Sequence, residues 1–118
     1  MQILFSLVLY RHSFKAIAPL LSSIRHLSEY AQGFSVCLNI YNAAPHKTDD
    51  PTPARVQSIV GSSLMVYQYA KNIGFGAANN CNLLPFSRGD ATLFIVVNPD
   101  ISFDSASLLP LLEWVANS

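Results

Sequence analysis

The sequence predicts an α/β fold in which helices cover both faces of an open, mostly parallel β-sheet. Apolar runs rich in strand-forming residues recur along the chain, and segments with a helical spacing of apolar residues separate them. Turn-forming residues, chiefly Gly, Pro, Asn and Asp, mark the junctions. Strands that alternate with helices are joined by right-handed β-α-β crossovers, and such crossovers produce parallel sheets.

The first strand and the first helix are predicted from the opening thirty residues. Residues 3–10 form a nearly continuous apolar run, which is typical of a strand covered on both faces. Ser13 is the expected N-cap of a helix over about 14–29, where apolar residues recur at helical spacing. Pro19 lies inside that segment and removes a backbone hydrogen bond, so it predicts either a kink or a helix that effectively starts later.

A second strand and a long loop come next. Residues 34–41 (FSVCLNIY) indicate another buried strand, which completes the first crossover. Residues 42–53 hold the densest turn chemistry of the chain and are predicted to form a loop. Residues 56–60 fit either a short helix or the end of a strand. The alternation of apolar and polar residues over 63–69 predicts a third strand.

The last third of the chain predicts a helix, a strand and a second helix. Good helix formers over 75–84 follow a glycine turn. Residues 91–97 (ATLFIVV) form the cleanest strand of the sequence, and we expect it at the centre of the sheet. Ser105 or Ser107 is the expected cap of a helix through Trp114, with Pro110 in its first turn.

Composition and charge limit the classes of function. The 118 residues suffice for one domain, residues 1–118, that buries a core without disulfides or metal ions. Seven basic residues balance seven acidic ones without forming a cluster along the sequence, which argues against nucleic acid as a partner. Cys37 and Cys81 have neither a metal-ligand spacing nor enough partners for a disulfide framework, so we expect reduced thiols in a cytoplasmic protein.

Other common sites and segments are not predicted. The apolar start lacks the basic residues of a secretory signal, and no apolar stretch reaches the roughly 20 residues that span a bilayer. Membrane contact, where it occurs, is then peripheral, at the inner face of the cell membrane. His12, His26 and His46 fall on different elements with no metal-ligand spacing, so they indicate surface histidines.

Polar or glycine-rich residues follow three of the four predicted strands. In open parallel sheets, ligands bind beyond the carboxyl ends of the strands, here after Tyr10, Tyr41, Tyr69 and Val97. The three segments are IYNAAP at 40–45, KNIGFGAANN at 71–80 and NPD at 98–100. Their convergence at one edge of the sheet would form a ligand-binding crevice.

Each of these segments also has a purely structural interpretation. Gly74 and Gly76 fit a tight turn before a helix as well as they fit a ligand loop. A dinucleotide fingerprint is disfavoured because Asn79 stands where the third glycine would be needed, and because the segment follows the third strand. Asp100 could hold Mg²⁺ or Mn²⁺ together with substrate phosphates, but an aspartate in a turn after proline is common.

Two segments in order resemble the signature of a known enzyme family. VYQYAKNIGFGAANNCNL followed by LFIVVNPDISFDSASLLPLLEWV is similar to the N-x-G-F-G-x-x-N-N and N-P-D motifs of bacterial family-2 glycosyltransferases of the rhamnosyltransferase type. SLVLYRHSFKAIAPLLSSI resembles the family's opening strand and helix, so the similarity covers nearly the whole chain. The resemblance implies the Rossmann-like half of a GT-A nucleotide-diphospho-sugar transferase fold.

The resemblance also implies a donor site and a metal. In the family, an Asp-x-Asp or Asn-x-Asp element holds a divalent cation on the sugar nucleotide's diphosphate, and the cation neutralises the leaving group as a Lewis acid. Asp100 would be the direct ligand of Mg²⁺ or Mn²⁺, with Asn98 as a hydrogen-bonding helper. The donor would be dTDP-rhamnose or a UDP-sugar. The implied nucleotide-sugar-binding residues are Tyr10, Asn42, Asn72, Gly74, Phe75, Gly76, Asn79, Asn80 and Asn98.

Two departures from the family pattern change what we expect of the chain. Asn42 stands where the family usually has an Asp that contacts the base or ribose, and alanines follow it, which puts base recognition in doubt. The family's catalytic base and acceptor site lie well beyond the N-P-D element, whereas this chain ends at Ser118. The interpretation is therefore a nucleotide-sugar-binding part that does not transfer sugar alone.

The parent enzyme would transfer the sugar, with inversion, to a saccharide acceptor in cell-surface polysaccharide or O-antigen synthesis. The alternative is a non-catalytic nucleotide-binding or interaction module derived from such an enzyme. Both interpretations expect an exposed apolar edge, which would allow homo-oligomers to form.

Overall fold

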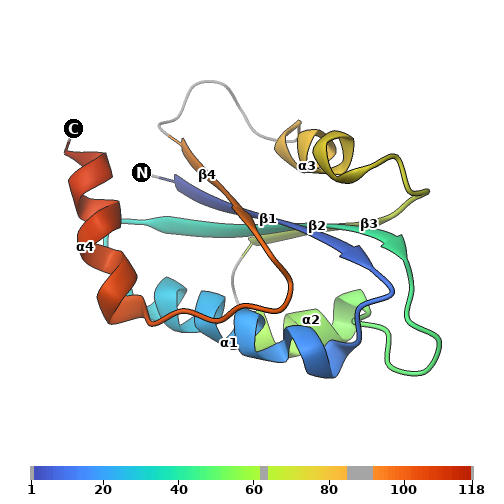
Figure 1. Cartoon of the computed structure of the whole chain (residues 1–118). Coiled ribbons are helices and arrows are strands. Elements are labelled where there is room, and N and C mark those ends of the chain that lie inside the picture. The colour runs from blue at the N-terminus through green and yellow to red at the C-terminus, as the bar shows by residue number, and fades with distance from the viewer. Residues whose placement is uncertain (1, 62–63, 85–91, 118) are drawn as a thin grey trace.

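A computed structural model describes residues 2–61, 64–84 and 92–117 of the chain (Figure 1). The described part holds one parallel four-stranded sheet and four helices, which confirms the predicted α/β class. In chain order the elements are β1 (Gln2–Tyr10), α1 (Phe14–Tyr30), β2 (Ser35–Ala44), α2 (Pro53–Val60), β3 (Leu64–Tyr69), α3 (Phe75–Leu83), β4 (Thr92–Val97) and α4 (Ser105–Ala116).

The order of strands across the sheet is β3, β2, β1, β4. Every pairing is parallel, so all four carboxyl ends lie at one edge of the sheet, called here the carboxyl edge. The chain adds β2 and then β3 on one side of β1, and β4 lies on the other side. This reversal makes the junction of β1 and β4 the topological switch point of the sheet.

Helices cover both faces of the sheet (Figure 1). The helices α1 and α2 lie on one face, α3 lies on the other, and α4 stands beside α1 near the amino ends of the strands. The main core lies between the sheet and the α1 and α2 layer. Its fully buried side chains include Phe5, Leu7 and Leu9 of β1, Leu38 and Ile40 of β2, and the stripe Ile17, Leu20, Leu21, Ile24 and Leu27 of α1.

The helix α1 begins where its cap predicts and continues through Pro19. Ser13 accepts a 3.1 Å hydrogen bond from the backbone N–H of Ala16, as expected of an N-cap. The expected later start is wrong, because the helix begins at Phe14. An interior proline costs about 3 kcal/mol, which burial of the five apolar side chains of the α1 stripe, at about 1.5–3 kcal/mol each, can offset.

The position of β4 differs from the prediction. β4 pairs with β1 and lies at an edge of the described sheet, so the expected central place is wrong. An apolar run reports how the two faces of a strand are covered and carries no information on its lateral neighbours. Here one face of the strand is also only partly covered, since the side chain of Val96 is 45% exposed.

Several element boundaries also differ from the predictions. The strand β2 continues through Ala44, so Asn42 lies in a strand rather than in a loop. Residues 53–60 form the helix α2, the first of the two alternatives. Asp104, rather than a serine, caps α4 by accepting from the N–H of Ala106 at 3.2 Å, and Pro110 lies in the second turn. The expected starts at residues 63 and 91 lie outside the described residues.

Large exposed apolar side chains occur on several elements of the described chain, α4 among them. Leu111 and Trp114 of α4 expose 55% and 70% of their surface, and Val96 of β4 exposes 45%. Isolated apolar residues on a surface are ordinary, but two large ones on one helix favour contact with another apolar surface. Self-association through this surface stays a prediction.

Candidate functional site

The carboxyl edge collects the segments that the sequence singled out. In the register of β1 and β4, Val97 pairs with Leu7, so the turn that follows Val97 runs beside the last residues of β1. A 3.4 Å hydrogen bond from the N–H of Ile101 to the carbonyl of Asn98 closes that turn. Asp100 is therefore placed at the switch point, on the carboxyl edge beside β1.

Asp100 is exposed, and it has no hydrogen bond or ion pair with any part of the chain that the structure describes. Those same residues contain no group of three or more His, Cys, Asp or Glu side chains that could hold a metal ion by themselves. A free carboxylate fits a cation such as Mg²⁺, which takes one or two protein carboxylates and completes its shell with phosphate and water.

The side chain of Asn42 is itself buried and points into a polar cluster rather than into solvent. Asn42 is 1% exposed, and its Nδ2 donates to Oδ1 of Asp50 at 3.2 Å and to the hydroxyl of Tyr67 at 3.0 Å. Asp50 also accepts from the N–H of His46 at 2.9 Å and from the hydroxyl of Tyr69 at 2.7 Å. We call Asn42, Asp50, Tyr67 and Tyr69 the Asn42 cluster; it ties the loop 45–52 to β2 and β3.

Asp50 is a residue that the sequence reasoning missed. It supplies a carboxylate beside position 42, where the resembled family has an aspartate of its own. Burial, and secondly the hydrogen bond to Asp50, raise the pKa of the Tyr69 phenol; burial is also the main reason that the pKa of Tyr67 is raised. Both phenols therefore stay neutral donors at ordinary pH. The Oδ1 atom of Asn42 is buried and has no hydrogen-bond partner among the described residues.

The glycine segment leaves β3 and enters α3 through an unusual backbone conformation. Gly74 has φ +91°, and its N–H donates to Oδ1 of Asn72 at 3.0 Å. The hydroxyl of Tyr41 donates to the carbonyl of Lys71 at 2.6 Å, which holds the start of the segment to β2. Nothing lies within 4 Å of the place where a Cβ would stand at Gly74 or at Gly76, so the space before α3 is open.

Asn79 and Asn80 of the same segment have different surroundings. Asn80 is exposed, and so is Phe75 at 54%. Asn79 is buried and faces the sheet, where its Oδ1 accepts a 2.5 Å hydrogen bond from the hydroxyl of Ser6. Its Nδ2 donates to the carbonyl of Phe75 at 3.0 Å. The structure thus gives the side chain of Asn79 a packing role, which the sequence reasoning did not predict.

Asn79 belongs to a buried polar network that fastens α3 to the sheet. Nδ2 of Asn82 donates to the hydroxyl of Ser6 at 2.9 Å and to the carbonyl of Leu7 at 3.3 Å. Nδ2 of Asn39 donates to the carbonyl of Asn82 at 2.6 Å. The sequence signal for this network is the pair of polar residues, Ser6 and Asn39, inside otherwise apolar strands. Buried polar side chains need hydrogen-bond partners, so Ser6 and Asn39 could have been matched to the asparagines of α3.

The N-terminus of α1 also lies at the carboxyl edge, but the protein itself covers it. The backbone carbonyl of Asp49 accepts a hydrogen bond from the N–H of Phe14 at 2.7 Å. The side-chain Oδ2 of Asp49 accepts one from the N–H of Lys15 at 3.0 Å. Arg55 contacts Oδ1 of Asp49 at 2.7 Å. The hydrogen bond from the backbone N–H of Lys15, and secondly the one from the side chain of Arg55, lower the pKa of the Asp49 carboxyl. A ligand phosphate cannot take this helix terminus while Asp49 occupies it.

A cavity of about 340 Å³ opens at the ends of β1 and β2, and cationic side chains line it. The lining residues are Arg11, Pro45, His46 and Lys47, and we call this cavity the basic pocket. The sequence reasoning missed it because Arg11 is far from His46 and Lys47 along the chain. The parallel pairing of β1 with β2 brings them together, and the N–H of Arg11 donates to the carbonyl of Ala44 at 2.7 Å.

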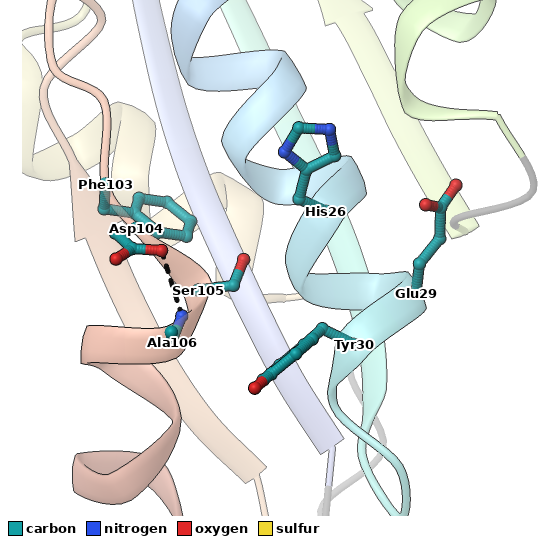
Figure 2. A pocket seen from close by; sticks show the side chains of 7 residues that line it. All are labelled: His26, Glu29, Tyr30, Phe103, Asp104, Ser105 and Ala106. Carbon is teal, nitrogen blue, oxygen red and sulfur yellow. Dashed lines mark hydrogen bonds between the residues drawn. The ribbon is translucent and has the colours of Figure 1, made fainter.

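A second cavity, of about 390 Å³, lies between the end of α1 and the start of α4 (Figure 2). It is near the amino ends of the strands, away from the carboxyl edge, because α1 runs back along the sheet. The hydroxyl of Ser105 points into it and has no hydrogen-bond partner among the described residues. None of the expected nucleotide-sugar-binding residues lines it; its lining consists of His26, Glu29, Tyr30, Phe103, Asp104, Ser105 and Ala106.

Fold and site define the class of protein: a Rossmann-like parallel α/β half-fold whose polar and glycine-rich segments lie at the carboxyl edge. Comparison with known proteins adds no relative: no family model matches the chain, and neither a curated protein nor a solved structure matches it significantly. Over residues 2–61, 64–84 and 92–117, none of the helices has the length and apolar character needed to cross a membrane.

Proposed function

We propose that this chain is the nucleotide-sugar-binding part of an inverting, rhamnosyltransferase-like glycosyltransferase that works in the cytoplasm, in peripheral contact with the inner face of the membrane. One observation carries the proposal: the pairing of Leu7 with Val97 puts the N-P-D turn, and with it Asp100, at the switch point of a parallel sheet. Ligands of open α/β sheets bind at this position.

The side chains at the carboxyl edge suit the parts of a sugar nucleotide. Asp100 would hold Mg²⁺ or Mn²⁺, with Asn98 beside it. The cation, when bound, supplies positive charge that stabilises the leaving diphosphate. The open space at Gly74 and Gly76 supports close approach of the nucleotide to the backbone of the glycine segment. The exposed side chain of Asn80 is free to face the same ligand, while Asn72 holds the turn through its bond from the N–H of Gly74.

The Asn42 cluster bears on the nucleotide's base or ribose. Because Asn42 is buried and bonded to Asp50, it would act on the ligand through the loop 45–52 rather than by direct contact. The dTDP-rhamnose or UDP-sugar donor of the full parent enzyme would then serve a saccharide acceptor in cell-surface polysaccharide or O-antigen synthesis.

Calorimetric titration of the chain with dTDP, UDP and GDP, each with and without Mn²⁺, tests the proposal. We expect Mn²⁺ to strengthen the binding of at least one nucleotide at least about tenfold. Asp100→Asn should weaken that binding at least about tenfold, since it removes the anionic ligand of the cation. Glu113→Gln is the matched control, because it removes one negative charge from an exposed position on α4.

Two outcomes would count against donor binding. Nucleotide binding that ignores Mn²⁺, or that survives Asp100→Asn unchanged, would favour the alternative of a non-catalytic nucleotide-binding or interaction module. Binding of NAD in preference to all three nucleotides would instead favour a dehydrogenase-type domain.

A further inference from the structure

The basic pocket is a separate feature of the carboxyl edge from the N-P-D turn. It lies at the ends of β1 and β2, while Asp100 follows β4 on the other side of β1. The side chains that line it come from two connections, Arg11 from the one after β1 and His46 and Lys47 from the one after β2. A pocket of this size lies in the lower range of small-molecule sites.

The charges in the basic pocket are not balanced by neighbouring acids. Neither Arg11 nor Lys47 forms an ion pair within the described ranges, and no carboxylate lines the pocket. The two carboxylates of the same loop are occupied. Asp49 is bonded to Arg55 and to the N–H of Lys15, and Asp50 is enclosed in the Asn42 cluster. Two cationic side chains that no carboxylate neutralises therefore line one cavity.

The backbone and the imidazole in the pocket are held in defined positions. Arg11 is the one non-glycine residue with positive φ in the part of the chain that the structure describes, at 58°. Such conformations carry strain and cluster at ligand-binding sites. The guanidinium of Arg11 stacks over the ring of Tyr10 at 5.0 Å from its centroid.

His46 is fixed by its own loop. Its Nδ1 accepts hydrogen bonds from the N–H of Asp49 at 2.9 Å and of Thr48 at 3.3 Å. The proton of the neutral ring is consequently on Nε2, the nitrogen that remains for a ligand. The pocket thus combines a guanidinium, an ammonium and an imidazole N–H, which all donate hydrogen bonds and match the oxygens of a phosphate.

We propose that the basic pocket binds a phosphate group, and that Arg11, Lys47 and His46 Nε2 are its ligands. The site needs no metal ion, which separates it from the cation site of Asp100. It rests on the proposed function only for the identity of the molecule that carries the phosphate, a nucleoside diphosphate.

Binding of pyrophosphate, inorganic phosphate and dTDP to the full chain in the presence of EDTA tests this site. We expect one equivalent of pyrophosphate or dTDP to bind without metal, more tightly than inorganic phosphate. Lys47→Ala and Arg11→Gly should each weaken binding about tenfold, as expected for the loss of a charge-assisted hydrogen bond. Glycine is chosen at position 11 because it tolerates the positive φ.

Lys47→Arg should bind within about threefold of the natural chain, because the charge is kept. Lys15→Ala is the matched control; it removes an exposed lysine that does not line the pocket and should change binding less than about twofold. Thermal unfolding of each variant checks that the fold is retained. Raising the salt concentration about tenfold should weaken binding, since exposed charges are screened.

Three outcomes would overturn the phosphate site. They are the absence of metal-free pyrophosphate binding, a loss of affinity in Lys15→Ala as large as that in Lys47→Ala, and thymidine binding as tight as dTDP binding. Asp100→Asn separates the two proposals. If metal-free pyrophosphate binding survives that change while Mn²⁺ strengthens the binding of no nucleotide to the natural chain, the proposed donor function fails and the phosphate site stands. If the reverse holds, the phosphate site fails and donor binding stands.

Discussion

The hydroxyl of Ser6 donates a 2.5 Å hydrogen bond to Oδ1 of Asn79, which joins the middle of the first strand to the helix after the glycine turn. Both residues are buried, at 0% and 6% exposure, so water cannot replace the bond. The same hydroxyl accepts from Asn82. The glycine segment therefore depends on a polar contact between residues 73 positions apart in the chain.

The first prediction separates the two adjacent asparagines of α3. Asn79→Ala should lower the free energy of unfolding by about 1–3 kcal/mol, because it leaves the buried hydroxyl of Ser6 without its acceptor. Asn80→Ala, at an exposed position, should change it by less than about 0.5 kcal/mol. Urea denaturation followed by circular dichroism measures both. Equal effects of the two changes would contradict the different surroundings of these side chains.

The second prediction concerns the Asn42 cluster. Asn42→Asp would place a carboxylate where Nδ2 now lies 3.2 Å from Oδ1 of Asp50, and two adjacent carboxylates cannot both ionise cheaply. We expect a loss of at least about 2 kcal/mol in the free energy of unfolding at pH 7.

Combining Asn42→Asp with Asp50→Asn should recover at least half of that loss, since the pair again has one charge. A double-mutant cycle in urea gives the coupling between the two positions. If the losses of unfolding free energy from the two single changes simply add in the double variant, the side chains of Asn42 and Asp50 do not interact.

The third prediction concerns acid sensitivity through Asp49. Its pKa is lowered in the folded chain, chiefly by the N–H of Lys15 and then by Arg55. Its stabilisation is therefore complete above the ordinary aspartate pKa and is lost as the pH falls through the lowered value, below about pH 4. Asp49→Asn should reduce the urea midpoint at pH 7. It should also make the decrease of that midpoint between pH 5 and pH 2 smaller than in the natural chain.

Asn80→Ala provides the comparison for that experiment, because it changes no ionisable group. Its urea midpoint should follow the natural chain across the same range of pH. An acid-induced fall of the same size in Asp49→Asn would exclude the proposed contribution of this carboxyl.

The fourth prediction uses two neighbouring glycines. Gly74 adopts φ +91° and ψ 157°, a conformation that a residue with a Cβ reaches only at a cost of about 1–3 kcal/mol. Gly74→Ala should lower the free energy of unfolding by about that amount. Gly76→Ala should be neutral or stabilising by up to about 1 kcal/mol, since Gly76 lies inside α3 with open space around it. Thermal and urea unfolding of both variants check the contrast.

Local patterns were enough to predict the class of fold and most of its elements. The apolar run at 3–10, the helix that begins after Ser13 and the strand after the third crossover follow from side-chain periodicity, because each residue type reports whether its own face is covered. The same patterns led us to expect polar residues at the strand ends, and parallel pairing places those ends at one edge.

Tertiary structure alone decided which residues at that edge lie together. Periodicity carries no information on lateral neighbours, so it could not show that β4 pairs only with β1 in the described sheet. The contacts of Asn42 with Asp50, of Ser6 with Asn79, and of Arg11 with Ala44 at the end of β2 join residues that sequence spacing does not relate. Such contacts depend on the strand order and register of the whole sheet, because these determine the distances between distant parts of the chain.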